Sequence, residues 1–192
     1  MTAALNLPAP DRTAPAPVTP QLAERLLSAL HTDQVADLLA GEPVPSAGAV
    51  ALTLRALADF PLCIRILPLS ARRHRGGDRA TGISDYLARF ADHLAHHGVR
   101  TPYDPGYWVL GEPVTDRLVR IVANAPTEPG STDARPTARQ SAATLLVLAD
   151  VQSLDLPRRM VEVAGDGDLP WNGATGIGLF LRELADRVAA AE

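Results

Sequence analysis

Helical spacing of apolar residues is the feature that most constrains the fold of this 192-residue chain. In segment after segment, large aliphatic or aromatic residues recur every three or four positions, which places them on one face of a helix. Leu22, Leu26 and Leu30 form the first such stripe. No segment predicts a sheet with comparable clarity. The pattern therefore predicts an all-α protein.

Residues that cap or open helices precede these stripes. Helices are predicted to begin after Thr19, at Thr32 or Asp33, after Ser46, after Ser84, at Val114, at Thr137 or Ala138, at Pro157 and near Thr175. The apolar segment 61–68 is bounded by prolines and fits either a short strand or a helical turn. Residues 69–82 are predicted to be a loop. The expected fold is an irregular bundle of about seven to eight helices.

Two segments rich in proline or turn formers divide the chain. Residues 1–18 hold four prolines among alanine and threonine, which predicts an extended, disordered tail. Residues 125–136 contain turn formers throughout and predict an internal linker. Apolar residues make up 46% of the sequence, enough for a packed core. Residues 19–192 are therefore expected to form a single helical domain.

Composition limits the cellular environments in which we expect this protein. The net charge is −4, and all 18 basic residues are arginine, which suggests a GC-rich bacterial genome and weakens arguments from any single arginine. The lone Cys63 excludes an intrachain disulfide and fits a reducing compartment. No apolar stretch approaches the ~20 residues of a membrane span, and residues 1–18 lack the pattern of a signal peptide. We expect a cytoplasmic protein without membrane contact and without a cofactor.

The segment 92–112 concentrates the residues that most often form binding sites. The candidates for contact with a ligand or a partner are His93, His97, Arg100, Tyr103, Asp104, Tyr107 and Trp108. The two histidines are four residues apart on one helix face, so they could bind a metal if Asp104 supplied a third ligand. Histidine is equally favoured in the last turn of a helix, where free carbonyls and the dipole attract it. No metal site is therefore predicted. The aromatic side chains suit a binding surface or a loop held against the bundle.

A second candidate is basic. Arg72, Arg73, Arg75 and Arg79 fall within the predicted loop and could contact phosphate or an acidic partner. No aromatic residue lies between them, so base stacking is not indicated. The first three predicted helices have a spacing similar to that of a helix-turn-helix. The third of them offers only Thr53 and Arg55 as polar side chains for base edges, so we expect it to be a core helix.

Two further features have a structural interpretation. The glycines in 172–178 are predicted to lie at a helix N-terminus capped by Thr175, but no strand precedes them and no lysine follows, as a phosphate-binding loop requires. Cys63 lies among proline, leucine and isoleucine, which predicts an inert thiol in the core.

Three classes of function remain. We expect first a non-catalytic helical protein that binds a protein partner or a second copy of itself, because no catalytic motif is complete. The first alternative is a DNA-binding transcriptional regulator, which the acidic charge does not favour. The second alternative is a small-molecule or metal-dependent enzyme with its site in 92–112.

Overall fold

The computed structural model describes residues 18–71, 78–97, 108–126, 135–165 and 170–191. Within these ranges the secondary structure consists of nine helices and one two-stranded hairpin. The helices are α1 (Pro20–Ala29), α2 (Asp33–Leu39), α3 (Ala47–Leu57), α4 (Phe60–Ala71), α5 (Arg79–Ala95), α6 (Val114–Asn124), α7 (Ala138–Leu148), α8 (Leu156–Ala164) and α9 (Pro170–Ala189), and the strands are β1 (Trp108–Val109) and β2 (Glu112–Pro113). The protein is mostly helical, as the apolar spacing predicts.

Several helices begin where the sequence predicts, and side chains explain why. The Thr19 hydroxyl accepts a hydrogen bond from the Leu22 amide, with Pro20 in the first helical position. The Ser46 hydroxyl accepts one from Ala49. Short polar side chains thus satisfy helix amides that have no partner within their own helix.

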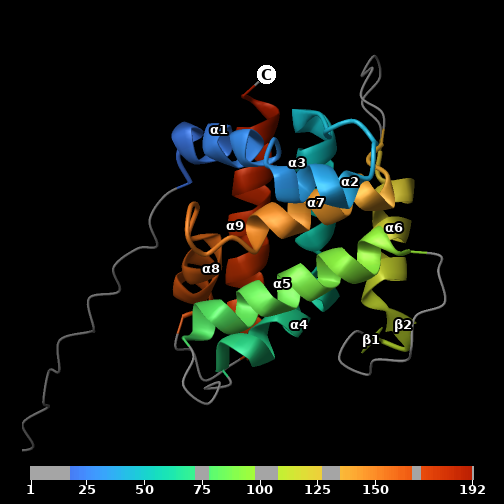
Figure 1. The fold of residues 1–192 in the computed structure, drawn as a ribbon. Helices are drawn as coiled ribbons and strands as arrows, with labels where there is room; N and C mark the ends of the chain where they lie inside the picture. The colour runs from blue at the N-terminus through green and yellow to red at the C-terminus, as the bar shows by residue number, and fades with distance from the viewer. Residues whose placement is uncertain (1–17, 72–77, 98–107, 127–134, 166–169, 192) are drawn as a thin grey trace, which may run out of the picture.

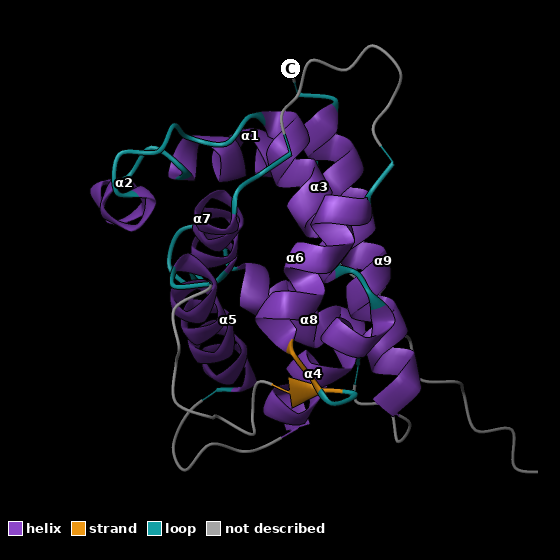
Figure 2. Ribbon diagram, turned by 90° about the vertical axis from the view of Figure 1, so that its right-hand side faces the viewer, coloured by secondary structure: helices purple, strands orange, loops and turns teal. Residues whose placement is uncertain are grey.

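Two groups of helices share one hydrophobic core (Figures 1 and 2). α9 packs against α3, α4 and α8, whereas α7 packs against α5, α2 and α3. α3 therefore contacts both groups, and most of its residues are buried, as predicted. The buried hydroxyls of Thr53 and Ser141 lie 3.2 Å apart and join α3 to α7.

Three boundaries differ from the predictions. The undecided segment 61–68 lies within α4, so it is helical and not a strand. α5 begins at Arg79, six residues before the start predicted after Ser84, because the Asp78 carboxylate caps it by accepting a hydrogen bond from the Ala80 amide. The helix that begins at Ala138 is expected from its apolar residues to reach about Leu154, but α7 ends at Leu148. The Asp150 carboxylate then accepts hydrogen bonds from the backbone amides of Gln152 and Ser153 in a turn.

The prediction for the glycines of 172–178 was wrong. They lie inside α9, which begins at Pro170. A β-carbon added at Gly176 would lie 2.2 Å from the Val163 carbonyl oxygen of α8, and one at Gly173 would lie 2.6 Å from the Leu67 side chain of α4. The absence of side chains lets α9 approach its neighbours, so these glycines serve packing and not a turn.

The predicted disordered tail and most of the predicted linker fall on residues 1–17 and 127–134, outside the described ranges. Val18, the last residue assigned to the tail, is instead buried against the core. None of the helices in the described ranges is both long and apolar enough to cross a membrane.

Candidate functional site

Four of the predicted site residues fall in the described parts of the chain. Arg79 is the first residue of α5, whereas His93 and His97 lie at its other end. Trp108 forms part of β1 and is half-buried. Arg79 therefore belongs to a helix and not to the predicted basic loop. The remaining candidates, Arg72, Arg73, Arg75, Arg100, Tyr103, Asp104 and Tyr107, lie outside the described ranges.

The end of α5 is attached to the start of α6 by a histidine. His97 Nε2 lies 2.9 Å from Asp116 Oδ1, and the His97 side chain is 28% exposed. His96 contacts the backbone and the carboxylate of Asp92, one turn earlier. Within the described ranges, no group of three or more histidine, cysteine, aspartate or glutamate side chains is arranged to hold a metal ion.

The β1–β2 hairpin joins the predicted binding segment to α6. Val109 pairs with Glu112, which leaves Leu110 and Gly111 as a two-residue turn. Both turn residues have positive φ, +50° at Leu110 and +82° at Gly111, as a type I′ turn requires. Val109 is buried, whereas the Leu110 side chain is 83% exposed. The hairpin thus anchors one apolar residue in the core and presents the next one to solvent.

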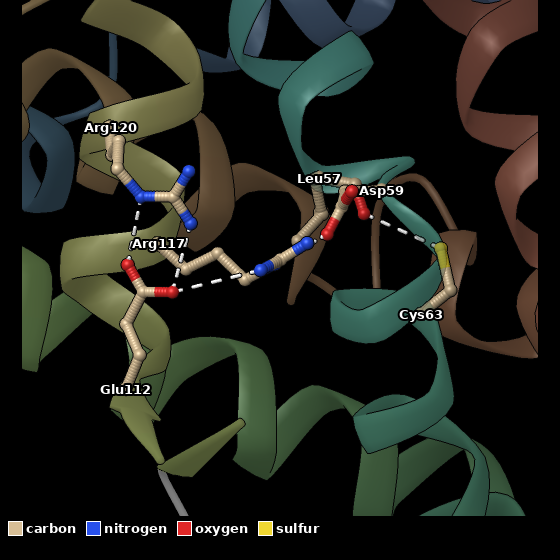
Figure 3. A network of polar contacts seen from close by, with 6 residues as sticks. All are labelled: Leu57, Asp59, Cys63, Glu112, Arg117 and Arg120. Carbon is tan, nitrogen blue, oxygen red and sulfur yellow. Dashed lines mark hydrogen bonds and ion pairs between the residues drawn. The ribbon is translucent and has the colours of Figure 1, made fainter. Parts of the chain in front are cut away.

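An ionic network holds the hairpin against the bundle (Figure 3). Glu112 of β2 accepts two hydrogen bonds from Arg120, with N–O distances of 3.0 and 2.9 Å. Its Oε2 also lies 3.6 Å from Arg117 Nη1, and Arg117 Nε donates to Asp59 at 2.6 Å. Asp59 occupies the junction between α3 and α4. The network therefore ties the hairpin, α6 and this junction together, and we call it the Arg117 clasp.

Two groups near the clasp have perturbed ionisation. The hydrogen bond from Arg120 holds the pKa of Glu112 below its ordinary value, with added attraction from Arg117. Burial and the charge of Asp59 raise the pKa of the Cys63 thiol to about 12. The thiol is fully buried, and its S–H donates a hydrogen bond to the Leu57 carbonyl oxygen, 3.4 Å from Sγ. The predicted position of Cys63 in the core is confirmed, and its inertness stays a prediction.

Two clefts open on the described surface. The first, here called the α3–α6 groove, has a volume of about 440 Å³ and is lined by Leu52, Arg55, Ala56, Arg120, Ile121, Asn124, Ala125 and Pro126. The second lies between α2, α5 and the turn after α7 and has a volume of about 490 Å³. Asp150 lines the second cleft. Partial burial alone would raise the pKa of Asp150, but hydrogen bonds from Ser153 and Gln152 outweigh it and lower the pKa.

Comparisons of the chain with protein-family models, curated proteins and solved structures found no match.

Sequence reasoning did not identify the residues that organise this region. The sequence does contain a hairpin signal, in which Trp-Val and Glu-Pro flank a two-residue turn that contains glycine. The signal is weak because each strand has only two residues. Asp59 and Arg117 are 58 positions apart, and no spacing rule connects them. The predicted neighbourhood does include the hairpin, but the exposed Leu110 was not among the candidates.

Proposed function

We propose that this protein acts by binding a protein partner and that the tip of the β1–β2 hairpin is the contact element. One observation carries the proposal: Leu110 is 83% exposed and has a φ of +50°. An exposed leucine alone is ordinary on a protein surface. A leucine in the left-handed region is not, because its β-carbon crowds the backbone there.

Folding stability does not account for leucine at this position. Asparagine or aspartate before glycine is the preferred pair in a type I′ turn. The other non-glycine residues with positive φ in the described ranges, Ala40 and Asp155, lie at the ends of α2 and α8, where the chain must leave or enter a helix. Leu110 alone among the three exposes a large apolar side chain. Burial in the pocket of a partner would repay both the strain and the exposure.

The surroundings of Leu110 suit a contact element. Buried Val109 and the Arg117 clasp fix the hairpin on both sides of the turn. A preorganised contact loses less conformational entropy on binding than a mobile loop does. Phe60, the residue directly after Asp59 of the clasp, is a second exposed apolar side chain, with 42% of its surface accessible.

The alternative of DNA binding through the N-terminal helices gains no support from the geometry. A recognition helix must present a polar face to the major groove. α3 buries eight of its eleven residues, Thr53 among them. Arg55, its other candidate, pairs with Asp186 of α9.

Site-specific photocrosslinking tests the proposal. A benzoylphenylalanine placed at position 110, in cells of the source organism, should give one discrete adduct, which mass spectrometry identifies. An adduct of twice the chain mass would identify a second copy as the partner, and any other discrete mass would identify another protein. The same probe at Leu179, which is 61% exposed on α9, is the matched control.

The adduct should diminish when wild-type protein without the probe is co-expressed in excess and should persist when the Leu110→Asn variant is co-expressed instead. The free energy of unfolding of this variant should be about 0.5 to 1 kcal/mol higher than that of the wild type, because Asn-Gly is favoured in a type I′ turn. If the Leu110→Asn variant is more stable than the wild type and no longer competes for the partner, Leu110 contacts the partner and does not stabilise the fold. The absence of an adduct at position 110, or equal adducts at 110 and 179, would overturn the proposal.

A further inference from the structure

The α3–α6 groove combines an apolar wall with two guanidinium groups. Leu52 and Ala56 lie one turn apart on α3, and Ile121 lies opposite on α6. Arg55 and Arg120 line the same groove, one from each helix. Among the described residues of its lining, these two arginines are the only ionisable side chains.

The acidic partners of both arginines stand outside the lining. Asp186 of α9 accepts from Arg55 Nη2 at 3.0 Å, and Glu112 accepts from Arg120 Nε and Nη2. A guanidinium has five N–H donors, so each arginine keeps donors that no acceptor in the described ranges occupies. The carboxylates thus orient the two guanidinium groups without filling the groove, and half of each arginine side chain remains exposed.

We propose that the α3–α6 groove binds a small organic carboxylate with an apolar body. Arginine matches a carboxylate through two parallel hydrogen bonds, which selects this group over a neutral one. The aliphatic residues between the arginines would take the apolar part of the ligand. A volume of about 440 Å³ falls within the range of small-molecule sites. The Asn124 side-chain amide donates to the Arg120 carbonyl, and its own carbonyl oxygen is an acceptor that a ligand hydroxyl or amide would use.

The groove proposal does not rest on the proposed docking of the hairpin, although Arg120 belongs to both regions: it binds Glu112 of the hairpin and also lines the groove. Leu110 is not part of the groove, so the Leu110→Asn variant should bind the carboxylate as the wild type does.

A pair of matched probes tests the proposal on the full chain. 2-Naphthoate and 2-naphthylmethanol share the apolar body and differ in the carboxylate. Calorimetric titration should give an affinity at least about tenfold higher for the carboxylate, since hydrogen bonds to a charged group exceed neutral ones by that order. In ¹⁵N-labelled protein, the largest amide shifts should fall on residues 52–56 and 120–125.

Variants assign the charge preference to the two arginines. The double variant Arg55→Gln with Arg120→Gln should bind both probes equally, at the affinity of the neutral one. Arg158→Gln is the matched control, because this arginine is 57% exposed and also lies near acidic partners. Its preference for the carboxylate should be unchanged. Equal affinity of the wild type for the two probes, no binding at millimolar concentration, or shifts mapped elsewhere would overturn the proposal, even if the double variant does not fold.

Discussion

From the close contact between α8 and α9 we predict how much a substitution of Gly176 lowers the free energy of unfolding. A β-carbon at this position would lie 2.2 Å from the Val163 carbonyl oxygen and 3.0 Å from its carbon. Carbon and carbonyl oxygen normally keep about 3.3 Å or more apart, so Gly176→Ala must push the two helices apart by about 1 Å. The obstacle is backbone, which no rotamer change can move aside.

Two opposing effects set the magnitude. Alanine is favoured over glycine inside a helix by about 1 kcal/mol. Overpacking of a tight contact costs about 1 to 3 kcal/mol, with backbone contacts at the upper end. We expect Gly176→Ala to lower the free energy of unfolding by about 1 to 2 kcal/mol net. For a chain of this size, that corresponds to a melting temperature lower by about 2 to 8 °C.

The neighbouring Gly178 supplies the control. A β-carbon there would lie 3.2 Å from the Ala58 carbonyl oxygen and 3.6 Å from Cys63 Sγ, contacts that need a shift of only a few tenths of an ångström. Gly178→Ala should therefore equal or exceed the wild type in stability. Urea unfolding followed by circular dichroism at 222 nm measures both variants. If both alanines stabilise the protein equally, the close approach of α8 and α9 is refuted.

Three further predictions concern the Arg117 clasp and its surroundings. Arg117→Met should lower the free energy of unfolding by about 1 to 3 kcal/mol in urea titrations, because Asp59, whose side chain is 26% exposed, loses its partner; unchanged stability would show that the clasp contributes nothing. The pKa of Glu112 is lowered in the folded state, so the ionised Glu112 stabilises the protein above its unfolded pKa of about 4.3, and this stabilisation is lost as the pH falls through the pKa of the folded state. The urea midpoint of Glu112→Gln should accordingly fall less steeply than that of the wild type between pH 5 and pH 3. Cys63, with its pKa raised to about 12, should react with a disulfide reagent at pH 8 only after unfolding in urea, and rapid labelling of the native protein would contradict its burial.

Some parts of the candidate site were within reach of the sequence. The segment 92–112 is predicted as a site because it concentrates histidine and aromatic residues. It does contain His97 and most of the hairpin, whereas Asp116, the partner of His97, lies beyond it. The sequence did not indicate Leu110 as a site residue, because a single leucine in a loop is not a pattern typical of a binding site. Its meaning depends on a backbone angle and an exposure that only the folded chain defines.

The glycines of α9 are a second case in which the local sequence did not indicate the role of a residue. Glycine near a predicted helix start indicates a turn by local rules. The approach of Val163 from α8 reverses that interpretation, because a residue without a side chain is what the contact between the two helices requires.

The sequence by itself determined most of the helices of this protein, with α4 as the exception. The spacing of leucines, together with caps such as Thr19 and Ser46, acts over three or four residues, and the hydrogen bonds of a helix have that same reach. Tertiary structure alone decided the Arg117 clasp, the α3–α6 groove and the presentation of Leu110. Each of these depends on side chains or backbone segments brought together from separate elements, and the spacing of residues along one helix carries no record of which other helix will lie beside it.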